Sequence, residues 1–344
     1  MTPRRHRPAP PPTGVLVMAH GTPDSPAGIE PFYTAIRRGR PPPPELLAEL
    51  DRRYEAIGGI SPLAERTRAQ VDGLAAALES AAPGEFTVRF GAKHTAPSIE
   101  DAVAELAGCG VGRAVGIVLT PHRSSLGSGE YLRRAEAAAA TASPPLALTP
   151  VPSWHRAEGL AQLLAHRTAA ALASLGPGDR TRTAVFFTAH SLPERALAHD
   201  DPYPIQVQES ASDIAAALAL DEVPGLSWGV AWQSAGRTAE PWVGPDLLTE
   251  VERVAGLGAT SVVVCPVGFV SDHLEVLYDL DIEAAGVARG AGMAFARTAS
   301  LDDDPQFLGL LARTVVAAAS APVAAPAAGA AAVAPAAADP TPPA

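Results

Sequence analysis

Short, continuous runs of apolar residues alternate along the chain with longer segments in which apolar residues recur every three or four positions. The short runs predict buried β-strands, and the longer segments predict amphipathic helices. In the first half, strands are expected at 15–18, 87–92, 114–119 and 146–151, with helices at 28–38, 45–56, 65–78, 99–106 and 130–140. In the second half, strands are expected at 184–189, 227–232, 261–265 and 293–297, with helices at 157–174, 204–219, 245–256 and 305–318. Two similar sets of alternating strands and helices predict an α/β fold of two doubly wound, Rossmann-like lobes with parallel sheets.

The same pattern divides the chain into four segments. Residues 1–13 are basic and rich in proline, and we expect a disordered lead there. An N-terminal α/β lobe is expected over 14–155 and a C-terminal α/β lobe over 156–319. Residues 320–344 are almost entirely alanine and proline, which predicts a disordered tail.

Polar residues gather where the predicted strands end. His20, His190 and Gln233 each follow an apolar strand, and the stretch 266–283 follows another. In open parallel sheets, ligands bind beyond the carboxyl ends of the strands. These residues are therefore expected to converge on one cleft.

Three carboxylates in this last stretch, at Glu275, Asp279 and Glu283, are four residues apart. On a helix that spacing advances about 40° per step, which would align them as one acidic stripe. A local capping box is the alternative, with Asp272 as the N-cap, Glu275 reaching back to it, and the other two carboxylates solvated. Spacing alone favours the capping box.

Paired with Glu275, His190 forms a candidate site for a divalent first-row metal such as Fe²⁺, although a lone histidine is more often bonded within a loop. A neutral imidazole can also accept a proton near neutral pH. His20 is either a core or turn histidine or a group that faces a ligand. Five arginines flank a proline break and are either solvated or bind carboxylates: Arg37, Arg38, Arg40, Arg52 and Arg53. Three tyrosines, taken singly, are interpreted as ordinary core aromatics: Tyr33, Tyr54 and Tyr131.

Composition excludes several classes of protein. The 344 residues carry a formal charge of −11 spread over the chain, and no basic patch stands out, which disfavours nucleic acid as the main partner. The two cysteines are too few for a Cys₄ metal site. The N-terminus lacks the apolar core of a signal peptide, and no run is long and apolar enough to span a membrane, so a cytoplasmic protein is expected. Phosphate-binding and nucleophile-elbow motifs are absent from the sequence.

The chain resembles the ferrochelatase family over about 14–318, and most closely the coproporphyrin ferrochelatases of the Gram-positive type. The resemblance is carried by V-L-V-M-A-H-G-T-P, I-R-R-G-R, R-Y-E-A-I-G-G-I-S-P-L-A, T-A-H-S-L-P-E, D-P-Y-P, P-W-x-G-P-D and, most specifically, P-V-G-F-V-S-D-H-L-E-V-L-Y-D. It implies a porphyrin cleft between the lobes and insertion of Fe²⁺ into coproporphyrin III, yielding coprohaem in haem biosynthesis and releasing the pyrrole protons.

The resemblance also implies roles for individual residues. His190 and Glu275 match the family's catalytic and metal-binding pair, and Asp279 and Glu283 match an acidic relay for iron or protons. Porphyrin contacts carry over to Arg37, Arg53, Tyr54, Ser61 and Tyr131. His20 replaces a tyrosine that can ligate the product iron in relatives, and imidazole is itself a good ligand for haem iron.

Two alternatives remain within this resemblance: a protoporphyrin IX ferrochelatase, and a carrier of haem or porphyrin that no longer catalyses. No permanently bound cofactor is expected, because Fe²⁺ is a substrate, and no iron–sulfur cluster, because the C-terminal region has no cysteine. We expect a monomer that makes transient contacts with neighbouring haem-pathway enzymes.

Overall fold

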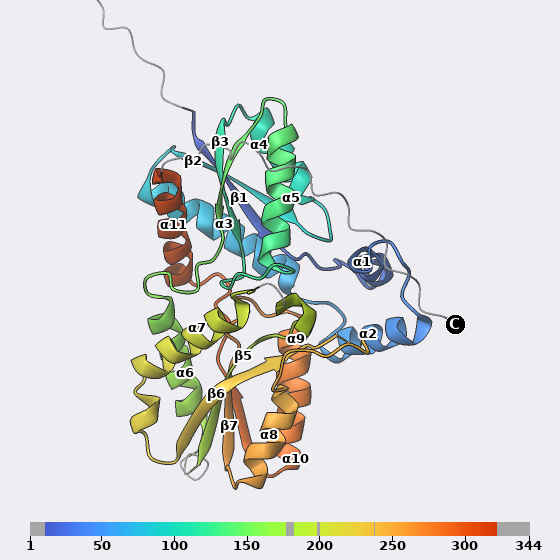
Figure 1. Ribbon diagram of the computed structural model, residues 1–344, viewed down its shortest axis with the longest axis vertical. Coiled ribbons are helices and arrows are strands. Elements are labelled where there is room, and N and C mark those ends of the chain that lie inside the picture. The colour runs from blue at the N-terminus through green and yellow to red at the C-terminus, as the bar shows by residue number, and fades with distance from the viewer. Residues whose placement is uncertain (1–10, 177–181, 198–199, 237, 322–344) are drawn as a thin grey trace, which may run out of the picture.

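The computed structural model describes residues 11–176, 182–197, 200–236 and 238–321, which form two stacked α/β lobes (Figure 1). The predicted leading and trailing disordered segments lie almost wholly outside these residues. The strands of the first lobe are β1 (Thr13–Ala19), β2 (Phe86–Ala92), β3 (Arg113–Val118) and β4 (Ala147–Val151). Those of the second are β5 (Thr183–His190), β6 (Leu226–Gln233), β7 (Ser261–Cys265) and β8 (Ala294–Arg297). The prediction of two parallel-sheet lobes is confirmed.

The two sheets have the same strand order. The first sheet runs β2-β1-β3-β4 and the second runs β6-β5-β7-β8, and every pairing is parallel. The leading strand of each lobe is therefore hydrogen-bonded on both sides: Val17 lies opposite Phe90 and Ile117, and Phe187 lies opposite Val230 and Cys265. All seven residues of β1 are buried, as a central strand covered on both faces requires.

Helices cover both faces of each sheet (Figure 1). The helices of the first lobe are α1 (Ile29–Ile36), α2 (Pro44–Ala56), α3 (Leu63–Ala81), α4 (Ile99–Gly108) and α5 (Ser128–Thr141), of which α1 and α2 lie to one side of the sheet rather than over it (Figure 1). In the second they are α6 (Leu160–Ser174), α7 (Tyr203–Ala217), α8 (Leu247–Gly256), α9 (Leu274–Val276) and α10 (Ala285–Gly290). Local chemistry sets several starts: Ser98 and Asp101 form a capping box on α4, and Asp246 caps α8.

The final helix, α11 (Pro305–Ser320), follows the second sheet in the chain but packs against the first lobe. It contacts α3 and the strands β3 and β4 (Figure 1). One apolar cluster accordingly runs from Val17 of the first sheet through Phe307 of α11 to Phe187 of the second. Because the lobes share this core, their facing edges are held in a fixed relation.

The helix after β7 differs from the regular α-helix that the four-residue spacing implied. After the single turn α9, residues Leu277–Ala284 form a π-helix, η5, which continues into α10. In a π-helix each N–H bonds to the carbonyl five residues back, so each turn takes in an additional residue. This widened turn buries Asp279 together with Leu280.

Candidate active site

His190 and Glu275 come together at the edge of the second sheet. His190 ends β5, and Glu275 lies in the first turn after β7, the neighbouring strand. The Nε2 atom of His190 lies 3.5 Å from Oε1 of Glu275. The two side chains are 37% and 36% exposed, so both face open space rather than the core. The structure therefore joins the two predicted metal-site residues.

A second imidazole, not anticipated from the sequence, lies on the other side of the same carboxylate. His273 Nε2 is 3.5 Å from Oε2 of Glu275, and the Phe269 ring packs against His273 at 4.9 Å between centroids. His273 stands two positions before Glu275 in the D-H-L-E motif. That proximity was the available signal, because a carboxylate and an imidazole at such a strand end are both metal ligands.

Backbone carbonyls fix the orientation of both imidazoles. His190 Nδ1 is 2.5 Å from the carbonyl of Ser191, and His273 Nδ1 is 3.0 Å from the carbonyl of Ser271. A carbonyl only accepts hydrogen bonds, so each Nδ1 carries the proton and each Nε2 is directed at Glu275. The carboxylate is thus bracketed by two oriented imidazoles.

Charge pairing shifts both pKa values at this site. Desolvation in the cleft lowers the pKa of His190, but the charge and hydrogen bond of Glu275 outweigh it and raise the pKa to about 9. Desolvation raises the pKa of Glu275, yet His190 and then His273 bring it well below its ordinary value. Without a ligand, the pair is therefore an imidazolium–carboxylate ion pair at neutral pH.

A buried amide links these two residues to the sheet. Gln233, at the end of β6, accepts a hydrogen bond from Thr188 at 2.8 Å and donates one to the backbone carbonyl of Glu275 at 3.3 Å. The carbonyl of Gln233 accepts the backbone N–H of Ser191 at 2.8 Å. The adjacent strand ends are thereby joined in one hydrogen-bonded frame.

The acidic stripe continues from Glu275 along the π-helix. The Asp279 side chain is only 8% exposed; it accepts a hydrogen bond from Ser234 at 2.5 Å and pairs with Arg53 at 3.4 Å. Glu283 lies 3.9 Å from the same guanidinium and is 33% exposed. Burial, followed by the charge of Glu275, raises the pKa of Asp279 to about 7. The stripe therefore runs from the exposed Glu275 through the buried Asp279 to the exposed Glu283.

The capping-box alternative is wrong. No side chain caps α9, whose N-cap residue is His273. Asp272 instead pairs with Arg297 at 3.1 Å and accepts a hydrogen bond from Ser300 at 2.6 Å. The tertiary contact with Arg297 holds Asp272 away from the helix start.

His20 lies at the end of β1 and is exposed, in contact with Phe32 and His94. The ring centroids of His20 and His94 are 4.7 Å apart. Desolvation lowers the pKa of His20, and the charge of Glu275, which acts in the opposite direction, only partly offsets this. The charge of Glu275, in the second lobe, therefore acts on His20 in the first.

The remaining predicted porphyrin contacts differ in their exposure. Tyr54, Ser61 and Tyr131 are 3%, 4% and 7% exposed, and burial raises the pKa of both phenols. Arg37 stacks on Tyr33 at 5.9 Å, and its buried Nε has no hydrogen-bond partner among the described residues. Arg53 does not stand free: it contacts Glu49, Asp279 and Glu283 and lies over the ring of Tyr278. The structure thus joins Arg53 to the acidic stripe.

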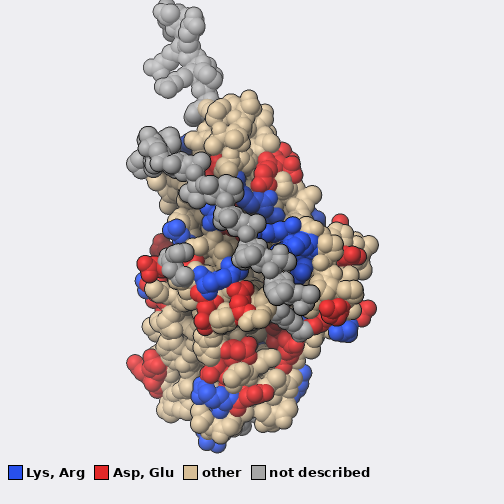
Figure 2. Space-filling model, turned by 45° about the vertical axis from the view of Figure 1, so that its right-hand side comes forward, with Lys and Arg blue, Asp and Glu red and all other residues tan. Residues whose placement is uncertain are grey.

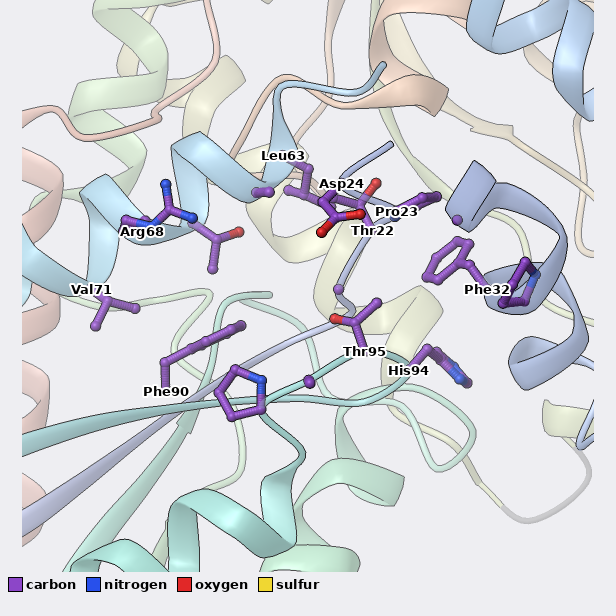
Figure 3. A pocket seen from close by; sticks show the side chains of 17 residues that line it. Thr22, Pro23, Asp24, Phe32, Leu63, Arg68, Val71, Phe90, His94 and Thr95 are labelled. Atoms are coloured by element: carbon purple, nitrogen blue, oxygen red, sulfur yellow. The ribbon is translucent and has the colours of Figure 1, made fainter. Parts of the chain in front are cut away.

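A separate cavity of about 520 Å³ lies within the first lobe. It is enclosed by α3, the end of β2 and the turn after β1, with Phe32 and His94 at one end (Figure 3). Its lining, which consists of described residues, includes none of the predicted site residues. It adjoins the cleft through His94, which touches His20.

Basic side chains from distant segments meet at mid-height of the molecule, above a more acidic lower lobe (Figure 2). Lys93 pairs with Glu130 at 2.6 Å, and the positive charges of Arg133 and Arg38 also act on that carboxylate. Lys93, Arg133 and Arg38 are far apart in the sequence, so only the fold reveals this gathering. The charge of Lys93 also acts on His20.

Two parallel-sheet lobes with an oriented imidazole–carboxylate pair at one strand edge are typical of an enzyme that handles a metal ion. The ferrochelatase family model matches residues 12–319. The chain is 40% identical over 304 residues to a ferrochelatase of Herpetosiphon aurantiacus, which covers 88% of this chain and 98% of the relative. It therefore belongs to the ferrochelatase family.

More specific relatives agree with this assignment, and one solved structure shares the fold. The chain is 43% identical to a coproporphyrin III ferrochelatase of Anoxybacillus flavithermus and 41% identical to one of Listeria monocytogenes. Each match covers 88% of this chain, and 95% and 96% of the respective relative. The SirB structure from Bacillus subtilis with Fe3+ is similar in fold, with a TM-score of 0.55 at 11% identity, over 90% of this chain and 96% of SirB. Among the described residues, no helix is long and apolar enough to cross a membrane.

Proposed function

We propose that this protein inserts Fe²⁺ into coproporphyrin III, producing Fe-coproporphyrin III in haem biosynthesis with release of the pyrrole protons. The observation that carries the proposal is the oriented His190–Glu275 pair, in a chain 41–43% identical to enzymes named coproporphyrin III ferrochelatases. Fe²⁺ and the porphyrin are both substrates.

Glu275 and His190 would receive the iron. Glu275 presents two oxygens, each facing an imidazole Nε2, and a dication arriving there competes with the proton that His190 carries. Once that proton has left, His190 Nε2 has a lone pair with which to ligate iron or accept a pyrrole proton. The Nδ1 bond to the Ser191 carbonyl keeps the ring oriented in either state.

Asp279 and Glu283 would carry the released protons, or incoming hydrated iron, along the π-helix. Asp279 is suited to relay protons because its pKa is raised to about 7, so both of its protonation states are populated near neutral pH. Glu283 is more exposed and continues the route to solvent. Arg53, which contacts both carboxylates, would hold the row in place.

The porphyrin would be held by groups on the first lobe. The partly exposed guanidinium of Arg37 would bind a propionate, and Tyr54, Ser61 and Tyr131 would line the bound macrocycle. Arg53 would bind a propionate by exchanging one of its present carboxylate partners. Coproporphyrin has more carboxylates than protoporphyrin IX, and the basic groups Lys93, Arg133 and Arg38 favour the more anionic substrate.

Several expectations remain predictions within this proposal. The protein is expected to hold no permanent cofactor and no iron–sulfur cluster, and its two cysteines lie in different lobes, in α4's C-cap and in β7. A monomeric state, a cytoplasmic location and transient contacts with neighbouring haem-pathway enzymes also remain predictions.

The test is an anaerobic assay in which purified protein and Fe²⁺ are given coproporphyrin III or protoporphyrin IX in parallel. We expect the free-porphyrin spectrum of coproporphyrin III to disappear over many turnovers. Faster metallation of protoporphyrin IX would overturn the substrate assignment. His190→Ala should abolish insertion while coproporphyrin binding, followed by fluorescence quenching, persists.

A carrier function is the second candidate, and the exposed imidazole of His20 favours it. With Nδ1 facing the carbonyl of Gly21 at 3.2 Å, the Nε2 atom of His20 is free to ligate product iron. If metallation stopped at one equivalent and coprohaem stayed bound, the carrier function would replace the catalytic one. Multiple turnovers would eliminate it.

A further inference from the structure

Tyr203, the first residue of α7, joins the two lobes at the back of the metal site. Its ring packs between Trp232 of β6 at 5.6 Å and His122 of the first lobe at 6.0 Å between centroids. Its hydroxyl donates a hydrogen bond to the backbone carbonyl of His190 at 3.1 Å. The residue is 7% exposed, so this hydrogen bond is shielded from water.

The peptide group that follows His190 is consequently held from both sides. Tyr203 binds its carbonyl oxygen, and its N–H, which belongs to Ser191, binds the carbonyl of Gln233 at 2.8 Å. The Ser191 hydroxyl donates to the carbonyl of Val243 at 2.8 Å, and Ser191 is 1% exposed. Because the carbonyl of Ser191 also fixes His190 Nδ1, rotation of this peptide group would change the direction of Nε2.

Asp201 connects this arrangement to the first lobe. One carboxylate oxygen accepts the backbone N–H of Tyr203 at 3.0 Å, and the other accepts the backbone N–H of Ser125 at 2.6 Å. Ser125 lies between β3 and α5, in the first lobe, whereas Tyr203 begins a helix of the second. Asp201 is 7% exposed, so a buried charge is held by one amide from each lobe.

Further contacts along α7 reinforce the same seam. The Gln206 side chain accepts the backbone N–H of Arg123 at 2.7 Å, and Ser210 lies 2.9 Å from Nε2 of the buried His122. The loop that contains His122, Arg123 and Ser125 is thus attached to α7 at Gln206 and Ser210, and to Asp201 just before the helix begins. The start of that helix is the point that touches His190.

We propose that Tyr203, held by Asp201, is a positioning residue that orients the imidazole of His190 toward the metal. Tyr203 thereby couples the orientation of this ring to the position of the first lobe relative to the second. The proposal rests on the proposed function, since it assigns His190 the role of receiving iron. Tyr203 acts through the backbone of His190 and does not touch the reacting atoms. Its loss should therefore affect chemistry and metal binding rather than porphyrin binding.

Tyr203→Phe tests this proposal because it keeps the ring and removes only the hydroxyl. In the anaerobic coproporphyrin assay we expect kcat to fall about tenfold, with KM for the porphyrin changed less than about twofold. Co²⁺ affinity in isothermal titration should weaken about tenfold, as for loss of an outer-shell partner of a metal ligand. Asp201→Asn, which retains one acceptor oxygen, should act in the same direction with a smaller effect.

The double variant distinguishes a positioning role of Tyr203 from a general destabilisation of the fold. If both residues act through one chain of contacts, Tyr203→Phe/Asp201→Asn should be within about twofold of Tyr203→Phe alone. The matched control is Asp213→Asn, which removes a carboxylate from the exposed face of α7, where it pairs with Arg156 at 2.9 Å. This control should match wild type in kcat and Co²⁺ affinity.

Three results would overturn the proposal: wild-type kcat and Co²⁺ affinity in Tyr203→Phe, a raised KM with unchanged kcat, or effects that multiply in the double variant. The Co²⁺ titration requires no turnover. Even if wild-type protein failed to metallate coproporphyrin, which would defeat the proposed function, that titration would still decide whether Tyr203 positions His190.

Discussion

The ends of β1 and β5 are corresponding places in the two lobes, and each carries a histidine in the same local sequence. Ala19-His20-Gly21-Thr22-Pro23 and Ala189-His190-Ser191-Leu192-Pro193 share the pattern A-H-x-x-P. Each leading strand has the same position in its sheet. In each case Nδ1 faces the carbonyl of the next residue, at 3.2 Å for His20 and 2.5 Å for His190. Backbone geometry therefore orients two similar imidazoles, one at the end of the leading strand of each lobe.

Their protonation differs because their neighbours differ. The pKa of His190 is raised to about 9 by Glu275, despite desolvation. The pKa of His20 is lowered by desolvation, and its neighbours His94 and Lys93 supply no carboxylate. Desolvation lowers the pKa of His94 to about 3, and the nearby His20 adds to the effect. A repeated strand end thus provides orientation, while the partner on the adjacent element decides whether the imidazole is charged.

Glu275→Gln should remove this difference in protonation between His190 and His20, and it should have the largest effect on turnover of the variants considered. Turnover should fall about 10³-fold, because the site loses both its anionic ligand and the proton-acceptor pairing. The pKa of His190 should drop from about 9 to below the ordinary histidine value, toward the behaviour of His20. The measurements are the anaerobic assay and an NMR pH titration of the His190 ring.

The accompanying stability change has a defined pH dependence. Because the folded-state pKa of His190 is raised, the ion pair contributes fully below the unfolded value, about 6.5, and is lost as pH rises through about 9. The difference in melting temperature between wild type and Glu275→Gln should therefore shrink over that range. Glu250→Gln, which removes the ion pair with Arg253 within α8, is the control. A His190 pKa still near 9 in Glu275→Gln would refute the assigned cause.

Asp279→Asn should stabilise the protein while slowing it. The folded-state pKa of Asp279 is raised to about 7, so the native state binds more protons than the unfolded state between about pH 4 and 7, and stability declines as pH rises through this interval. Asparagine mimics the neutral carboxyl group, so the variant should gain on the order of 2 kcal/mol over wild type by pH 8 and little at pH 4. Chemical denaturation at the two pH values measures this gain.

The same variant should lose about tenfold in turnover if Asp279 relays protons, since an amide cannot carry them. Asp281→Asn, on the same π-helix but paired with Arg297 at 2.6 Å, is the matched control for activity. A stability gain independent of pH, or unchanged turnover, would contradict the relay assignment.

Buried strands and their terminal polar residues leave a local pattern, so the sequence was sufficient to predict the lobes and the strand ends. It left the pairing of His190 with Glu275 as one of two alternatives, and the family resemblance favoured the pair. It could not predict His273 as a second partner or Tyr203 as a support, since both depend on distances set by tertiary packing. The capping box failed for a related reason: Asp272 is bound by Arg297, 25 residues away. The π-helix was missed because carboxylates four apart fit an α-helix equally well.

His20→Ala should have a much smaller effect on the reaction than loss of His190, because His20 has no carboxylate with which to bind the entering metal. We expect kcat to change less than about threefold, whereas the absorption spectrum of bound coprohaem should shift as an axial ligand is lost. Turnover and the spectrum of the ferric product complex are both measured. A loss of activity as large as that of His190→Ala would show that both His20 and His190 take part in iron insertion.

The two cysteines provide the smallest test of the difference between the lobes. Cys109 is exposed at the end of α4, whereas Cys265 in β7 is fully buried. Burial raises the pKa of the Cys265 thiol to about 11. Iodoacetamide at pH 7.5 should therefore modify Cys109 alone and leave turnover unchanged, and Cys109→Ser should abolish labelling, as followed by intact mass. Because Cys265 pairs with Phe187 in the strand register that supports His190, labelling of Cys265 would mean that the second sheet opens in the native protein. Such opening would contradict the conclusion that the strand edge that supports the His190–Glu275 geometry is rigid.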